Sequence, residues 1–183
     1  EKYGFIKTLE KIDGMFAIAA WDNLEKKLFL TRDRIGEKPL YYNINEDFLV
    51  FGSNLNSIKV FPNEKLNISN EAVSAFLKLN YIPSPLSIYE NIKKLEPGHY
   101  IELNQLTKIT QKKKYWEIKD DSKKTVNNEN IIDRSEALLL KTVESQLISD
   151  VEIGTLLSGG IDSTIITLMA HKILKKKFKT FTL

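Results

Sequence analysis

A short apolar strand leads into a glycine-rich loop and then into a helix within Leu156-Leu157-Ser158-Gly159-Gly160-Ile161-Asp162-Ser163-Thr164. We predict the strand over 151–157, the helix over about 163–174 and the start of a second strand after it. The two glycines allow a tight turn and let backbone N–H groups approach a ligand without a Cβ in the way. The first turn of the helix presents free N–H groups and the positive end of the helix dipole to the loop, which suits an anion.

The polar side chains of this loop add hydrogen-bond donors and one acid. Ser158, Ser163 and Thr164 offer hydroxyls, and Asp162 offers the hard oxygen ligand that Mg²⁺ prefers beside phosphates. The loop lacks the Gly-Lys-Ser/Thr ending of a Walker A loop, and with it the lysine that holds the β- and γ-phosphates there. These residues favour a metal-bridged pyrophosphate site. The alternative is a structural turn in which Ser and Gly serve only as cap and turn residues.

A polar, lysine-rich stretch at 118–129 is predicted to be a linker, because the order of predicted helices and strands differs before and after it. After it, an amphipathic helix over 131–149 precedes the strand, loop, helix and strand, an order typical of a parallel α/β sheet. Before it, the chain is rich in strands and hairpins. We therefore expect two domains, at 1–117 and 130–183.

The N-terminal part predicts an α+β arrangement. A helix over 1–12 is followed by a hairpin of two strands at 15–21 and 27–31, the first buried on both faces. Further elements are a strand pair at 40–42 and 48–52, a helix opened by Ser69 or Asn70, and a strand after the turn at Pro97-Gly98. The aromatic residues expected in the core are Phe16, Trp21, Phe29, Tyr41 and Tyr42.

Composition excludes several classes of protein. With 42% hydrophobic and 28% charged residues, the 183-residue chain can bury a core, and no run of about eighteen apolar residues predicts a membrane span. The lack of cysteine excludes a thiolate zinc site or a cysteine nucleophile in this chain and fits the cytoplasm, where we expect it. His99, which we expect in a turn, and His171 lie too far apart to favour a catalytic triad. The net charge of +3 comes mostly from scattered lysines, so we expect no nucleic-acid partner.

Residues 158–163 resemble the SGGxDS pyrophosphate loop of the N-type ATP pyrophosphatases, which adenylate a carboxylate or carbonyl oxygen and release pyrophosphate. Residues 12–22 and 28–42 resemble the later half of a class II glutamine amidotransferase domain, in the version found in glutamine-hydrolysing asparagine synthetases of the B type. The resemblance continues through Phe51-Gly52-Ser53, Tyr81-Ile82-Pro83-Ser84-Pro85, Lys94-Leu95-Glu96-Pro97-Gly98-His99, Tyr115-Trp116 and Ser149-Asp150-Val151-Glu152-Ile153-Gly154.

This resemblance implies a fold and a reaction. The fold is α+β, an incomplete N-terminal-nucleophile-type glutaminase β-sandwich with helices, followed by the start of an α/β parallel-sheet ATP pyrophosphatase domain. In the family, an N-terminal cysteine releases ammonia from glutamine, ATP converts aspartate to β-aspartyl-AMP, and ammonia displaces AMP to give asparagine. The implied small molecules are glutamine, aspartate, ATP and Mg²⁺, with no membrane partner, and a homodimer of the full-length protein fits the resemblance.

The resemblance also assigns site residues. Leu156 would contact adenine through its backbone, and Asp162 would bind Mg²⁺. The residues that would bind the phosphates are Ser158, Gly159, Gly160, Ile161, Asp162 and Ser163.

The chain also departs from the family pattern. It has no cysteine, and the family's glutamine-binding and distal adenylation residues match no position between Glu1 and Leu183. We therefore expect an inactive fragment with no catalytic residue of its own. Asn54 stands where the family commonly has Glu after Ser53.

Several alternatives remain open. A relative could amidate another carboxylate, such as a sugar acid in surface-polysaccharide synthesis or the substrate of a β-lactam synthetase. The chain could also be a non-catalytic nucleotide-binding remnant. A tRNA-modifying pyrophosphatase shares the loop, but the amidotransferase-like half counts against it. Arg32-Asp33-Arg34 could line a domain interface or ammonia path, although we favour an ion-pair cluster that fixes the loop between strands.

Overall fold

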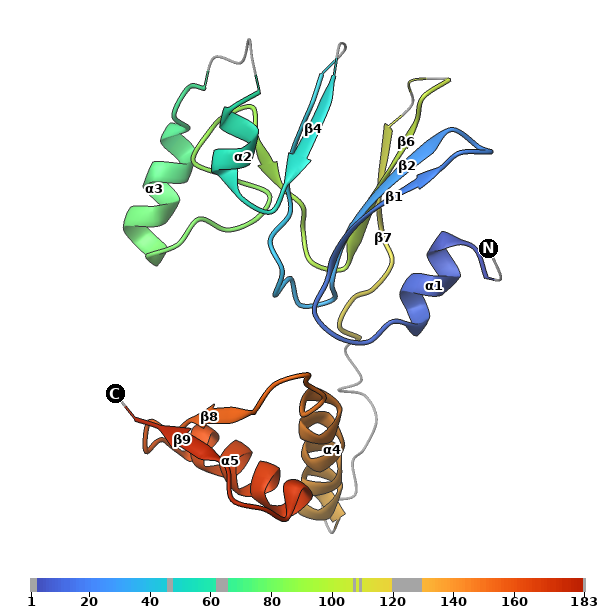
Figure 1. Cartoon of the computed structure of the whole chain (residues 1–183). Helices are drawn as coiled ribbons and strands as arrows, with labels where there is room; N and C mark the ends of the chain where they lie inside the picture. The colour runs from blue at the N-terminus through green and yellow to red at the C-terminus, as the bar shows by residue number, and fades with distance from the viewer. Residues whose placement is uncertain are drawn as a thin grey trace. The chain divides into compact units, whose positions relative to one another are not determined.

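The computed structural model describes residues 3–45, 48–61, 66–106, 108, 110–119 and 130–182. The chain divides into two compact units, residues 1–119 and residues 120–183. In Figure 1 the first unit combines antiparallel strands with helices, and the second combines helices with a short strand pair. Each unit is described by itself. No helix among the described residues is long and apolar enough to cross a bilayer.

The larger sheet of unit 1 is antiparallel throughout and has the strand order β1-β2-β6-β7. These strands are β1 (Ala17–Asp22), β2 (Lys27–Arg32), β6 (His99–Asn104) and β7 (Thr110–Lys114). Leu30 lies at the centre of the sheet, opposite Ala19 on one side and Ile101 on the other. The predicted hairpin of the first two strands is therefore confirmed.

The smaller sheet of unit 1 has the order β4-β3-β5. It consists of β3 (Tyr41–Ile44), β4 (Leu49–Gly52) and the two-residue β5 (Lys93–Lys94). The main core cluster draws on both sheets and the segments between them, and consists of Leu30, Leu40, Leu95 and Ile101, with Ala17, Leu28, Tyr42, Ile44 and Leu49 packed around it. The two sheets are thus joined by one apolar core, which is the dominant favourable term in folding this unit.

Three helices complete unit 1: α1 (Phe5–Lys11), α2 (Leu55–Lys59) and α3 (Asn70–Leu79). Phe5 of α1 stacks on Phe29 with 4.4 Å between ring centroids, so α1 covers the face of the larger sheet opposite Leu28 and Leu30. The predicted cap of α3 is confirmed, because the Ser69 side chain accepts a hydrogen bond from the Ala72 N–H. Asn54 caps α2 in the same way through the Asn56 N–H.

Several predictions for unit 1 were wrong. β1 is not buried on both faces: Trp21, expected in the core, is 49% exposed, because β1 is an edge strand of the sheet and its side chains alternate between covered and open faces. The sequence did not predict α2 or β7. All five residues of β7 are exposed and three are lysines, a composition typical of a protected sheet edge. His99 begins β6 instead of lying in the turn.

Unit 2 consists of α4 (Ile131–Gln146), β8 (Gly154–Leu156), α5 (Ile161–Leu174) and β9 (Lys179–Phe181). The two strands pair in parallel, with Thr155 opposite Thr180, and α5 forms the connection between them. α4 packs against α5, which packs against β8. The predicted helix, strand, loop, helix and strand order is confirmed.

The boundaries in unit 2 differ from those predicted. β8 is shorter than the apolar run at 151–157, since only its last part pairs with β9, and α5 begins two residues early, at Ile161. The apolar face of α4 is mostly open, with Val143 buried but Leu138 66% exposed. Of the predicted linker at 118–129, residues 120–129 lie outside the described part of the chain.

Candidate functional site

The Asp33 carboxylate organises the loop that follows β2. Its Oδ1 accepts hydrogen bonds from the N–H groups of Ile35 (3.2 Å), Gly36 (2.6 Å) and Glu37 (2.9 Å). Its Oδ2 accepts from the N–H groups of Lys38 (3.0 Å) and Phe16 (3.3 Å). The residue is only 2% exposed. The carboxylate is therefore committed to five backbone donors, one of which lies beside β1.

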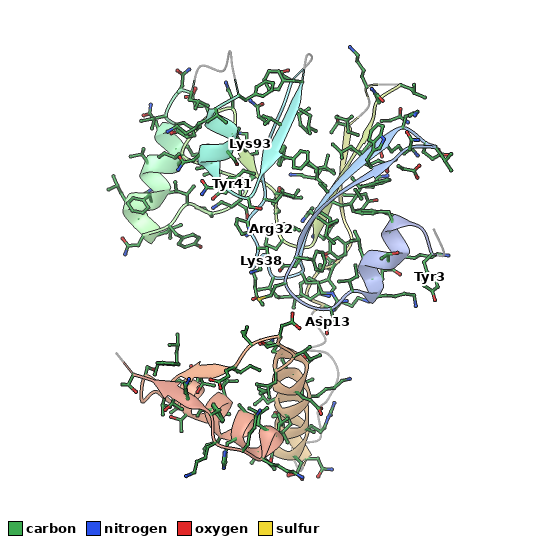
Figure 2. The ribbon with its side chains drawn as sticks, viewed as in Figure 1. Tyr3, Asp13, Arg32, Lys38, Tyr41 and Lys93 are labelled. Carbon is green, nitrogen blue, oxygen red and sulfur yellow. The ribbon has the colours of Figure 1, made fainter. Side chains whose placement is uncertain are left out.

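The Arg32 guanidinium makes the complementary set of bonds. It donates from Nε to the Lys38 carbonyl and from Nη1 to the Leu95 carbonyl, both at 2.8 Å, and from Nη2 to the Gly36 carbonyl. Leu95 directly follows β5, so Arg32 links the end of β2 to the smaller sheet (Figure 2). A planar fork with several donors suits this multiple capture of carbonyl groups.

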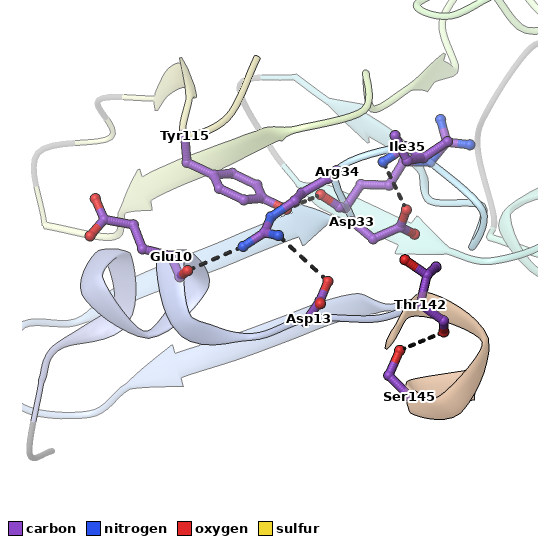
Figure 3. A network of polar contacts seen from close by, with 9 residues as sticks. Glu10, Asp13, Asp33, Arg34, Ile35, Tyr115, Thr142 and Ser145 are labelled. Carbon is purple, nitrogen blue, oxygen red and sulfur yellow. Dashed lines mark hydrogen bonds and ion pairs between the residues drawn. The ribbon is translucent and has the colours of Figure 1, made fainter. Parts of the chain in front are cut away.

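Neighbouring groups complete a network around the same loop (Figure 3). The Tyr115 hydroxyl donates to the Arg32 carbonyl at 2.9 Å, and Arg34 pairs with Asp13 at 3.5 Å and donates to the Glu10 carbonyl. The prediction that this cluster fixes the loop is confirmed, but its two central charges bind backbone groups instead of pairing with each other. Each side-chain nitrogen of Arg32 and each carboxylate oxygen of Asp33 already has at least one backbone partner.

Burial and hydrogen bonding act in opposite directions on Asp33. Burial alone would raise the pKa of its carboxyl group, but the N–H donors of Lys38, Glu37, Gly36 and Phe16 outweigh it and hold the pKa below the ordinary value of an aspartate. Burial lowers the pKa of the Arg32 guanidinium, which the charge of Asp33 opposes. Burial also raises the pKa of Tyr115. The Asp33 carboxylate therefore stays ionised at neutral pH, and the cluster holds the loop of unit 1 in place.

The loop between β8 and α5 turns at Gly159 and is open to solvent. Gly159 adopts φ +81°, which side-chain-bearing residues rarely adopt, and nothing lies within 4 Å of the position a Cβ would take. Ser158, Gly159, Gly160, Ile161 and Asp162 are all exposed. Leu156, the last residue of β8, is also exposed, at 75%.

The hydroxyls of the loop bind one another and one carbonyl. The Oγ atoms of Ser158 and Ser163 lie 3.1 Å apart, and Ser163 and Thr164 both donate to the Gly160 carbonyl, at 3.1 and 2.8 Å. Gly160 is the N-cap of α5 and provides no side-chain cap, so the first N–H groups of α5 have no intrahelical acceptor. The predicted phosphate-binding residues are thus gathered at one helix N-terminus.

Asp162 lies in the first turn of α5, and its exposed carboxylate has no ion pair or side-chain hydrogen bond with the described residues. Within the same part of the chain, no group of three or more His, Cys, Asp and Glu side chains could hold a metal ion. A cation at Asp162 would therefore need oxygen ligands from outside the described residues, such as those of a phosphate group.

A pair of threonines joins α5 to β8 beneath the loop. The Thr167 Oγ1 donates to the Thr155 Oγ1 at 3.1 Å in a half-buried position.

We expect Thr167→Val to lower the free energy of unfolding by about 1 kcal/mol, because the Thr155 hydroxyl loses its partner. The double variant Thr155→Val/Thr167→Val should recover most of that loss, since two methyl groups then replace two hydroxyls. Urea denaturation of the single and double variants checks this, and strictly additive losses would contradict the coupling.

Comparison with known proteins agrees with both units. Residues 1–116 match the family described as "Glutamine amidotransferase domain", and residues 134–183 match the family described as "Asparagine synthase". The chain is 35% identical over 190 residues to the glutamine-hydrolysing asparagine synthetase 2 of Bacillus subtilis, with 98% of this chain and 25% of that protein covered. The chain belongs to the glutamine amidotransferase domain family, and its C-terminal part matches the asparagine synthase family. Asparagine synthetase 1 of the same organism is 32% identical over 172 residues, with 94% of this chain and 27% of that protein covered.

The chain spans 25% and 27% of the length of these two asparagine synthetases, and 36% of the length of a putative glutamine-hydrolysing asparagine synthetase 2 of Methanocaldococcus jannaschii, to which it is 34% identical over 185 residues. Among solved structures, a glutamine phosphoribosylpyrophosphate amidotransferase from B. subtilis, complexed with ADP and GMP, aligns with 97% of this chain and 34% of its own. Its TM-score of 0.36 and sequence identity of 12% are too low for any inference about the fold.

The loop residues of unit 2 were predicted from the sequence, but the residues that hold the loop in place were not. The Thr155–Thr167 pair and the contacts of Leu157 described below carried no signal, because a threonine on a strand or helix has no distinctive spacing. The extent of the Asp33 network was also missed, since its partners are backbone groups that any sequence contains.

Proposed function

We propose that this chain is the part of a glutamine-dependent asparagine synthetase in which the glutaminase domain ends and the ATP-binding domain begins. Residues 1–117 form the C-terminal half of a class II glutamine amidotransferase domain with the N-terminal-nucleophile fold. Residues 118–129 form the linker, and residues 130–183 form the first part of an ATP pyrophosphatase domain. The full-length protein transfers the amide nitrogen of glutamine to aspartate, with conversion of ATP to AMP and pyrophosphate in the cytoplasm.

The observation that carries the proposal is the loop at 158–163 between a parallel strand and an uncapped helix. Its geometry fits a pyrophosphate group, because the open space at Gly159 and the free N–H groups of α5 allow close approach of phosphate oxygens. Ser158 and Ser163 would donate to those oxygens, Ile161 and the two glycines would contact them through the backbone, and the Leu156 backbone would contact adenine. Asp162 would hold Mg²⁺, which supplies charge neutralisation between the phosphates.

The residues of this chain perform binding and orientation in the proposed reaction. The loop holds the β- and γ-phosphates while a carboxylate oxygen of aspartate attacks the α-phosphorus, so that the P–O bond to pyrophosphate breaks as the acyl–phosphate bond forms. Ammonia then attacks the activated carbonyl carbon, and AMP leaves with the bonding electron pair. Unit 1 would supply the scaffold for the source of ammonia, with the Asp33 network fixing its loop.

Product analysis of the nucleotide tests the proposed chemistry. The full-length protein with glutamine, aspartate, MgCl₂ and ATP should yield AMP and pyrophosphate in equal amounts. Formation of ADP and inorganic phosphate would instead show cleavage at the γ-phosphate and would rule out the pyrophosphatase assignment of unit 2.

A further inference from the structure

Leu157 lies between β8 and the glycine loop and is held by two consecutive residues at the end of β9. Its N–H donates to the Phe181 carbonyl at 2.8 Å. Its carbonyl accepts a hydrogen bond from the Thr182 Oγ1 at 2.9 Å. Because β8 ends at Leu156 and β9 ends at Phe181, both contacts extend the attachment of the strands to the residue before Ser158.

The far end of the loop is also fixed. Ser163 and Thr164 tie the first turn of α5 to the Gly160 carbonyl, and Thr167 ties the same helix to β8. Between these two fixed ends, Gly159 has no neighbour that a Cβ would meet and sits at φ +81°. The position of Ser158 and Gly159 therefore depends directly on how firmly Leu157 is held.

Thr182 holds Leu157 through its side-chain hydroxyl. The acceptor is a main-chain carbonyl at the end of the ladder, and the donor comes from a side chain just past the last paired residue of β9. Valine has the same shape as threonine but no donor, and serine keeps the donor. The role of this hydroxyl can therefore be separated from the role of the side-chain volume.

We propose that Thr182 is a positioning residue for the nucleotide, because its hydroxyl fixes the Leu157 carbonyl and so places the loop residues that face the phosphates. This inference rests on the proposed function of the loop. A loop that is fixed before the ligand arrives loses less conformational entropy when the ligand binds, and affinity rises accordingly. Thr182 itself contacts the protein and not the substrate.

Three variants of the full-length protein test this role: Thr182→Val, Thr182→Ser and the control Thr180→Val. Thr180 lies two residues earlier on the same strand, is exposed, and has no side-chain hydrogen bond with the described residues. Amide hydrogen exchange at Ser158–Gly160 without nucleotide reports on the loop, equilibrium binding of Mg-ATP reports on the site, and the melting temperature reports on overall stability.

Thr182→Val should speed exchange at these amides several-fold and weaken Mg-ATP binding by about threefold to tenfold, since one neutral hydrogen bond is lost. Thr182→Ser should retain the exchange rate and the affinity of the unsubstituted protein, and Thr180→Val should change neither. Unchanged affinity in Thr182→Val, with or without a lower melting temperature, would overturn the positioning role. An equal effect in Thr180→Val would also overturn it. Failure of the unsubstituted protein to bind Mg-ATP would instead reject the proposed function, on which the inference rests.

Discussion

Replacement of Asp33 by alanine is expected to lower the free energy of unfolding of unit 1 by about 3 to 4 kcal/mol. The substitution removes the acceptor for five backbone N–H groups around a residue that is 2% exposed. Hydrogen bonds to a charged acceptor contribute more to stability than the average hydrogen bond does. Chemical denaturation followed by Trp fluorescence measures the loss, because Trp21 and Trp116 both lie in this unit.

Asp33→Asn separates the charge from the shape and gives a second, pH-dependent signature. The folded protein holds the pKa of Asp33 below its ordinary value, so the unfolded chain takes up this proton more readily as the pH falls. The stability that Asp33 contributes is therefore present above about pH 4 and is lost as the pH drops through the folded pKa. We expect Asp33→Asn to be less stable at pH 7 and to lose less stability than the natural protein between about pH 5 and pH 2.

Parallel acid-denaturation curves for the two proteins would contradict the account of Asp33. Glu37→Gln provides a matched control, since its side chain is exposed and only its backbone N–H joins the network. We expect its free energy of unfolding at pH 7 to stay within about 0.5 kcal/mol of that of the natural protein.

Asp162→Asn is expected to reduce aspartate-dependent pyrophosphate release by the full-length protein at least about a hundredfold. In the proposed site, the carboxylate is the only charged oxygen ligand that this loop offers to Mg²⁺, and an amide in its place neutralises less of the cation's charge. The side chain is exposed and has no side-chain partner among the described residues, so the melting temperature should change little.

Asp133→Asn serves as the control for Asp162→Asn, because both acids lie in the first turn of a helix of unit 2. Both substitutions remove one favourable charge–dipole contact, worth at most about 1 kcal/mol at an exposed site. Glutamine hydrolysis by the full-length protein should persist in both variants. Normal pyrophosphate release by Asp162→Asn would show that this residue does not hold the metal ion.

Local patterns in the sequence were sufficient to predict most of the fold. The strand at 27–31, the cap at Ser69 and the helix, strand, loop and helix order around 158–163 all follow from hydrophobic spacing and turn chemistry. Trp21 was placed wrongly because an apolar run does not reveal whether its strand lies at a sheet edge. β7 was missed because its lysines are selected for exposure at such an edge and not for a strand pattern.

The loop residues of the candidate site could be predicted from the sequence, but the residue that holds the loop from β9 could not. Gly159 and Asp162 could be predicted from residue type and spacing. Thr182 could not, because it binds Leu157 from a neighbouring parallel strand that is distant in sequence. Arg32 and Asp33 were correctly expected to fix a loop. Their partners could not be named in advance, because backbone carbonyl and N–H groups are common to every residue.

The most direct test of the proposed function follows the nitrogen atom. The full-length protein is incubated with amide-¹⁵N-labelled glutamine, L-aspartate, MgCl₂ and ATP, and the products are identified by mass spectrometry. We expect asparagine with ¹⁵N in its side-chain amide, formed in the same amount as AMP and dependent on aspartate. AMP formation that is independent of aspartate, or ¹⁵N in the amide of a different carboxylic acid and none in asparagine, would contradict the assignment of this chain to an asparagine-forming enzyme.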